Sequence, residues 1–145
     1  MNLSAYCERL GAGFWAEPFN ALTNLGFFVA GLAAWRLWRR QGRGDRPALA
    51  LILLAPLIGA GSFVFHTVPA RWSGLADVIP IQLFAFGYFL LAMRRFLGLG
   101  AIAATLATAA FVIASLALQQ WLAPQLPRGA RGSAAYASFV VALFA

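Results

Sequence analysis

Three residues near the middle of the chain have side chains suited to hydrolysis, at spacings that bring them together. Ser62 and His66 are four residues apart, which places them on one face of a helix. Asp77 follows across a short loop, in the first turn of the next apolar stretch, so we expect it close to His66. A histidine can bind Zn²⁺, a carboxylate can take a proton from metal-bound water, and a hydroxyl can donate to a developing oxyanion. The pattern therefore indicates metal-assisted hydrolysis.

A second polar face precedes this group. Glu17, Asn20 and Asn24 recur at i, i+3 and i+7, so they share one face of a helix. All these polar residues also have structural explanations. Asparagines can join membrane helices, a serine can bond back to its own helix, an aspartate can complement a helix dipole, and a lone histidine can lie hydrogen-bonded at the membrane interface. A catalytic Zn²⁺ site needs three protein ligands, and one histidine with a few carboxylates does not complete that set.

The composition determines what surrounds these residues. Of the 145 residues, 62% are hydrophobic and 10% are charged, whereas soluble domains carry about 25% charged residues. Such a chain cannot cover a water-exposed surface, and it is too apolar for intrinsic disorder. Its one cysteine, Cys7, excludes a disulfide scaffold. The sequence therefore predicts an all-α integral membrane protein, because helices satisfy their own backbone in lipid.

The net charge of +7 comes from arginines that cluster beside apolar stretches. Five lie between Arg36 and Arg46, and Arg94 and Arg95 form a pair. Arginine-rich loops of this kind face the cytoplasm in membrane proteins. No basic face is interleaved with stacking aromatic residues, so we expect no nucleic-acid partner.

Apolar stretches predict four full transmembrane helices and an incomplete fifth, all in a single domain. Their expected ranges are residues 19–38, 48–69, 75–93, 96–118 and 133–145. The last range is short of the roughly 20 residues that cross a bilayer, so we expect the chain to lack a C-terminal part. Pro80 lies inside the third helix, where its missing N–H frees the carbonyl of Ala76.

Two motifs resemble the alkaline ceramidase family, which belongs to a superfamily of seven-helix intramembrane hydrolases that includes the adiponectin receptors. The first is YCER at Tyr6–Arg9, followed by FWAEPFNALTN at Phe14–Asn24. In the second, three residues separate Ser62 from His66 and ten separate His66 from Asp77, within GSFVFHTVPARWSGLADVIPI. The second motif is similar to bacterial members. This resemblance implies a seven-helix fold in a bacterial inner membrane.

The resemblance also implies an enzyme that hydrolyses the amide bond of ceramide-like membrane lipids to a fatty acid and a sphingoid base. His66 would be one of three Zn²⁺ ligands, Asp77 would orient or deprotonate the bound water, and Ser62 would stabilise the oxyanion. Glu8 and Glu17 match the family's Ca²⁺-binding acids, but they offer fewer oxygens than the six to eight that Ca²⁺ takes. The family's other two Zn²⁺ ligands come from a late His-x3-His pair, and this sequence has no second histidine. We therefore expect the 145 residues alone to be inactive.

Two other classes of function remain open. A relative that kept the helices without the chemistry would be a receptor-like or scaffolding membrane protein. A transporter could use Asp77, His66 and Glu17 as a proton path, although polar residues elsewhere in the apolar stretches are few. A haem carrier is poorly supported, because one histidine cannot supply an axial pair. The sequence makes no prediction of the oligomeric state.

The arginine distribution predicts the orientation of the chain in the membrane. We expect residues 1–18 outside the cytoplasm and the Arg36–Arg46 loop inside it. In intact cells an impermeant thiol reagent should label Cys7, and it should label Arg43→Cys in a Cys7→Ser background only after permeabilisation. The reverse labelling pattern would contradict this orientation.

Overall fold

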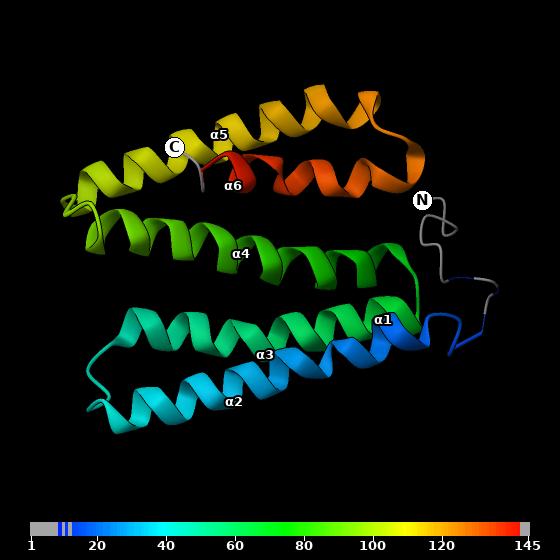
Figure 1. Cartoon of the computed structure of the whole chain (residues 1–145), viewed down its shortest axis with the longest axis horizontal. Coiled ribbons are helices and arrows are strands. Elements are labelled where there is room, and N and C mark those ends of the chain that lie inside the picture. Colours follow the sequence, from blue (N-terminus) through cyan, green and yellow to red (C-terminus); the bar gives the residue numbers. More distant parts are fainter. Residues whose placement is uncertain (1–8, 10, 12, 143–145) are drawn as a thin grey trace. The chain divides into compact units, whose positions relative to one another are not determined.

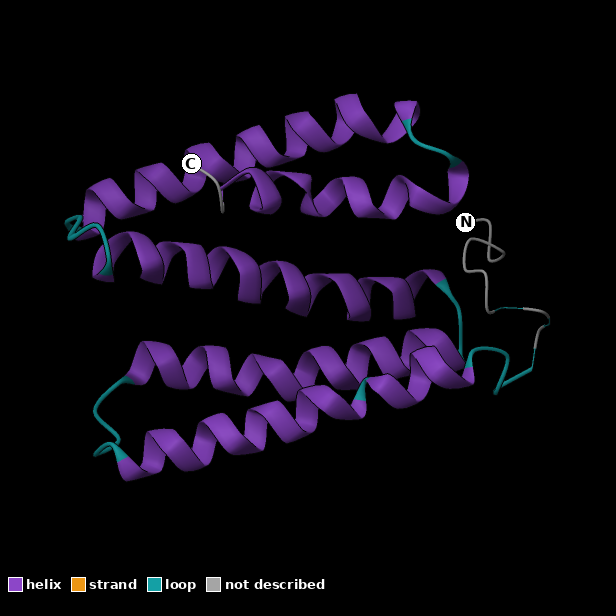
Figure 2. Cartoon of the chain, in the orientation of Figure 1, coloured by secondary structure: helices purple, strands orange, loops and turns teal. Residues whose placement is uncertain are grey.

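The computed structural model describes all residues except 1–8, 10, 12 and 143–145. The described residues form helices and no strands, which confirms the all-α prediction (Figures 1 and 2). In chain order the elements are α1 (Pro18–Thr23), α2 (Leu25–Arg40), α3 (Arg46–Thr67), α4 (Arg71–Arg95), α5 (Ala101–Leu122), the 3₁₀ helices η1 (Ala123–Gln125) and η2 (Arg128–Tyr136), and α6 (Ala137–Ala142).

Three helical stretches among the described residues are long and apolar enough to cross a membrane. They are Arg46–Thr67, Arg71–Arg95 and Ala101–Gln125. Many large apolar side chains are exposed, including Phe19, Ile102 and Ile113, while most of the buried polar side chains are small or paired. A surface this apolar is suited to lipid, so the chain is an integral membrane protein.

The predicted helix boundaries hold only approximately. The range 75–93 begins earlier, at Arg71, and the range 96–118 begins later, at Ala101, because Gly98 has a φ of +66° and interrupts the helix. The described part of the range 133–145 is divided between η2 and α6. Three helices meet the length and hydropathy requirement for a span, so the structure supports a membrane helix bundle without fixing the count of four spans.

The chain divides into two compact units, Met1–Tyr88 and Phe89–Ala145, with the boundary inside α4. In the first unit, α1 and α2 run alongside α3 (Figure 1). In the second, α5 lies beside η2 and α6. The aromatic rings of Phe89 and Phe111 stack with centroids 4.2 Å apart, and Phe139 packs edge-on against Phe111. The second unit is therefore held by apolar and aromatic packing.

The helix predicted over residues 19–38 is interrupted at Asn24, between α1 and α2. The Asn24 side-chain amide donates to the Asn20 carbonyl at 2.8 Å, and that carbonyl would otherwise accept the Asn24 backbone N–H. The Asn24 N–H turns instead to the carbonyl of Leu22. A local hydrogen bond from a buried polar side chain thus divides the helix in two.

The arginine-rich loop between α2 and α3 is an ordered turn. The Arg43 N–H donates to the Trp38 carbonyl across Gly42, which has a φ of +93° and ends α2 in a Schellman motif. Asp45 caps α3 by accepting the Ala48 N–H at 3.0 Å. The Trp38 indole N–H also donates to the Asp45 carbonyl at 2.7 Å, which ties the two helix ends together.

Glycines let helices approach closely in the first unit. A Cβ on Gly59 would lie 2.8 Å from the Phe28 ring and 3.0 Å from the Asn24 carbonyl oxygen, so α3 and the start of α2 nearly touch there. A Cβ on Gly61 would lie 2.0 Å from the Ala76 carbonyl oxygen. That oxygen lacks a helical partner because Pro80 has no N–H to offer. The backbones of α3 and α4 therefore meet at Gly61 and Ala76, one residue before Ser62 and Asp77.

This close approach predicts a strong response at Gly61. Gly61→Ala should destabilise the protein by about 1–3 kcal/mol or more, because backbone atoms of α4 would have to move. Gly26→Ala is the matched control, since a Cβ there meets nothing within 4 Å. It should be neutral or stabilise by about 0.5–1 kcal/mol through helix propensity. Unfolding of both variants in detergent micelles measures the difference, and equal stabilities would exclude the tight contact.

Candidate functional site

Buried polar residues gather where α1, the end of α3 and the start of α4 meet. The group consists of Glu17, Asn24, Ser62, His66, Thr67, Ser73 and Asp77. The sequence placed Glu17 and Asn24 on one helix face, and Ser62 and His66 on another. In the structure the polar residues form two connected clusters. One surrounds the carboxylate of Glu17, and the other surrounds that of Asp77.

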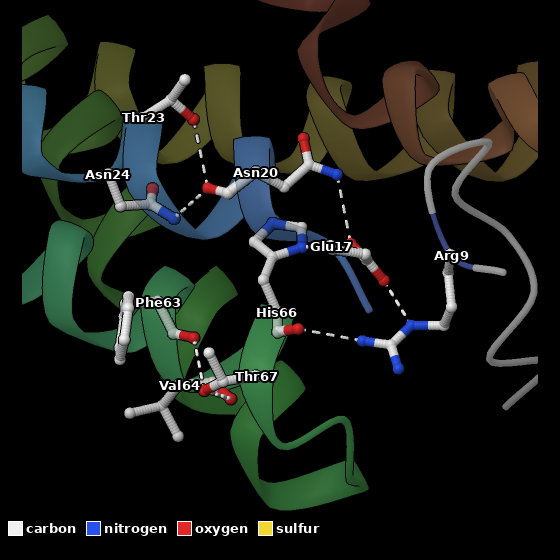
Figure 3. Close-up of polar contacts among 9 residues, drawn as sticks. All are labelled: Arg9, Glu17, Asn20, Thr23, Asn24, Phe63, Val64, His66 and Thr67. Carbon is white, nitrogen blue, oxygen red and sulfur yellow. Dashed lines mark hydrogen bonds and ion pairs between the residues drawn. The ribbon is translucent and has the colours of Figure 1, made fainter. Parts of the chain in front are cut away.

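Glu17 is the most deeply buried charged residue described, with 1% of its surface exposed. Arg9 Nε donates to its Oε1 (Figure 3). Asn20 Nδ2 donates to Oε2 at 3.1 Å, and His66 Nδ1 lies 2.5 Å from the same oxygen. Because an ionised carboxylate only accepts, His66 carries its proton on Nδ1 here. Three N–H donors from three parts of the chain thus surround this carboxylate.

These donors determine the ionisation of Glu17. Burial raises the pKa of this carboxyl, but the hydrogen bonds from His66, Arg9 and Asn20 outweigh burial and hold the pKa below its ordinary value. Glu17 is therefore ionised at neutral pH. Because its pKa is lowered on folding, its contribution to stability is present at neutral pH and is lost only as the pH falls through the folded-state value.

Arg9 also closes the end of α3. Its Nη2 donates to the backbone carbonyl of His66 at 3.0 Å, which is one of the last carbonyls of that helix (Figure 3). Thr67 Oγ1 donates to the Phe63 carbonyl at 2.9 Å. A positive charge at a helix C-terminus is also favourable to the helix dipole. One guanidinium therefore links the N-terminal segment to Glu17 and to α3.

The second cluster joins α3 to α4. Ser62 and His66 both lie near enough to the Asp77 carboxylate to act on its charge. Asp77 is 8% exposed, and its Oδ1 is buried with no hydrogen-bond partner among the described residues. Ser62, His66 and Asp77 thus converge as their spacing predicted. An unpartnered buried carboxylate oxygen is costly, and it marks a position where a proton, water or ligand would be held.

Ser73 builds the turn that places Asp77. Its hydroxyl is fully buried, donates to the Val68 carbonyl at 2.7 Å and accepts the Ala70 N–H at 2.8 Å. These contacts fix the α3–α4 connection within one turn of helix. Sequence reasoning passed over Ser73, and its position four residues before Asp77 was the available signal.

The other predicted site residues have different outcomes. Asn20 contacts Glu17 directly, whereas Asn24 bonds within its own helix and shapes the α1–α2 break. Glu8 lies outside the described residues. Arg9 was not singled out as a site residue, although a lone arginine among acids in a charge-poor chain indicates a buried partner.

The described residues contain no group of three or more His, Cys, Asp or Glu side chains placed to hold a metal ion. One feature does fit a zinc ligand, because metal-binding histidines usually donate their second ring nitrogen to a carboxylate, as His66 does to Glu17. The zinc and calcium assignments remain predictions.

Comparison of the chain with protein-family models, curated proteins and solved structures found no match.

The α3–α4 turn offers a test of what positions the site. Ser73→Ala should destabilise the protein by about 1–3 kcal/mol, because it removes the hydroxyl that bonds both the Ala70 N–H and the Val68 carbonyl. Ser115→Ala is the control, since Ser115 is also buried but bonds only to the Phe111 carbonyl of its own helix. It should cost less than about 1 kcal/mol. Equal losses in an unfolding titration would mean that the Ser73 hydroxyl does not hold the turn.

Proposed function

We propose that this protein is an intramembrane hydrolase that cleaves the amide bond of ceramide-like lipids to a fatty acid and a sphingoid base. One observation carries the proposal: Asp77, with a buried and unpartnered Oδ1, lies beside Ser62 and His66 between two helices apolar enough to span a membrane. A lipid substrate reaches such a site from the bilayer. The motif resemblance supplies the class of substrate.

In this proposal Asp77 is the general base. Its Oδ1 accepts a proton from the attacking water, with the Ser62 hydroxyl beside the carboxylate. Water adds to the amide carbonyl, the C–N bond breaks and the amine leaves with the proton. In the structure Ser62 lies beside Asp77, so its proposed role at the oxyanion requires the hydroxyl to turn toward the substrate.

Zinc fits this site only in part. Glu17 fixes the His66 ring through Nδ1, which would make Nε2 the metal-binding nitrogen. A catalytic Zn²⁺ ion takes three protein ligands, and the described residues do not supply that set. Further donors from beyond the described residues would have to complete the site. When bound, Zn²⁺ would lower the pKa of a water molecule.

The fold and topology that accompany this function are also proposed. The six residues of α1 and the sixteen of α2 are together enough to cross a bilayer as one interrupted span. With α3, α4 and α5 they would make four full spans of a seven-helix bundle, with η2 and α6 beginning a fifth. We place the protein in a bacterial inner membrane, with its N-terminus outside the cytoplasm.

A non-catalytic receptor-like or scaffolding protein is the second candidate. The network of Arg9, Glu17 and His66 favours it, because this network joins three segments and would stabilise the bundle without any reaction. Metal content separates the two candidates. A hydrolase should carry about one Zn²⁺ per intact protein, and His66→Ala should remove it.

Substitutions at the Asp77 cluster test the hydrolase proposal in the intact protein. Asp77→Asn should lower kcat for a ceramide-like substrate by about 10²–10⁴-fold through loss of the base. Ser62→Ala should lower it by about 10²–10³-fold. Asn24→Ala is the control, because it should affect packing and leave kcat nearly unchanged. Absence of both bound zinc and lipid-amide cleavage in the intact wild type would favour the second candidate.

A further inference from the structure

We propose that the guanidinium of Arg9 is a built-in cation that occupies the position of a metal ion at Glu17, so that this end of the bundle is stable without Ca²⁺. The motif resemblance matches Glu8 and Glu17 to Ca²⁺-binding acids, although these two acids offer few oxygens for that ion. The contacts around the Glu17 carboxylate are of the wrong kind for it.

A calcium ion is held by six to eight oxygen atoms, which act as electron-pair donors to the metal. The atoms that contact the Glu17 carboxylate are Arg9 Nε, Asn20 Nδ2 and His66 Nδ1, and each directs an N–H toward it. N–H groups cannot ligate a cation, because their hydrogens carry positive charge. The shell around Glu17 is therefore complementary to the anion itself and is not part of a calcium cage.

Arg9 also performs the joining role that a metal ion would have. A bound cation would link acids near the N-terminus to the neighbouring helix. Arg9 instead joins Glu17 through Nε and the His66 carbonyl through Nη2 (Figure 3). Its planar guanidinium can satisfy two acceptors at fixed directions, which a lysine ammonium does less well. Arg9 and Glu17 are both nearly inaccessible, with 6% and 1% of their side chains exposed.

Arg9 further acts on the histidine indirectly. The carboxylate that it neutralises is the one that holds His66 Nδ1, and the carbonyl that it bonds belongs to the same histidine. Arg9 is thus a positioning residue for His66 through two separate contacts. Removing it would leave the buried Glu17 carboxylate with only the Asn20 and His66 donors.

The test is thermal unfolding of the purified full chain in detergent, with the calcium concentration varied. The melting temperature of the wild type should be the same in EGTA and in millimolar Ca²⁺. A clear rise of the wild-type melting temperature with Ca²⁺ would overturn the proposal. This comparison needs no variant and does not depend on hydrolysis, so its failure is distinguishable from failure of the proposed function.

Variants test the role of the charge. Arg9→Gln should lower the melting temperature by at least about 5 °C, because it strands a buried carboxylate. Arg71→Gln is the matched control, since Arg71 is exposed at the start of α4, and it should shift the temperature by no more than about 2 °C. Arg9→Lys should recover part of the lost melting temperature, because lysine keeps the positive charge but lacks the planar guanidinium that bonds two acceptors. Equal shifts for Arg9→Gln and Arg71→Gln would overturn the proposal.

A double variant distinguishes charge compensation from loss of packing. If Arg9 balances Glu17, then Arg9→Gln combined with Glu17→Gln should melt at a higher temperature than Arg9→Gln alone, since no charge is left unpaired. If the Arg9 side chain matters only by filling space, the second substitution should lower the temperature further. The second outcome would contradict the proposal. Where Arg9→Gln alone is unfolded in detergent, a double variant that also fails to fold would contradict it.

Discussion

A negative charge that is nearly removed from solvent organises one end of this bundle. A buried carboxylate is stable only when it is paired and hydrogen-bonded, and Glu17 receives its donors from an N-terminal arginine, from α1 and from α3. Meeting that requirement brings three segments to one point and fixes the direction of the His66 ring. The capping of α3 by Arg9 follows from the same arrangement, because the guanidinium has donors to spare once Glu17 is satisfied.

The second cluster depends on the backbone. Membrane helices gain little from apolar burial against one another, so small residues and polar contacts join them. Gly61 allows α3 to touch the carbonyl that Pro80 leaves unbonded on α4, and the residues that follow each contact point are Ser62 and Asp77. The same close approach that joins the helices therefore forms the polar pair. Ser73 adds a tight connection, which limits how far α4 can slide.

The two clusters differ in how completely they are satisfied. Around Glu17 both carboxylate oxygens have donors, which suits a structural role that supports His66. At Asp77 one buried oxygen has no partner among the described residues, which suits a group that takes part in binding or proton transfer. Reactive sites commonly place a fully hydrogen-bonded residue, here Glu17, behind the side chain that it orients, here His66. The group with an unused acceptor, here Asp77, then lies beside that oriented side chain. This contrast is the structural basis for proposing Asp77 as the reactive group and the residues around Glu17 as the ones that position His66.

The sequence by itself determined the all-α class and the membrane environment, since composition and long apolar runs leave no other way to satisfy the backbone in lipid. It also placed Ser62 and His66 on one face with Asp77 nearby, because a four-residue spacing and a short loop restrict the geometry. Only the tertiary structure decided the break at Asn24, where a side-chain hydrogen bond overrides a continuous apolar pattern. It alone identified Arg9 as the residue that joins Glu17 to the end of α3, because Arg9 and His66 are far apart in the chain and helical spacing carries no information about such contacts.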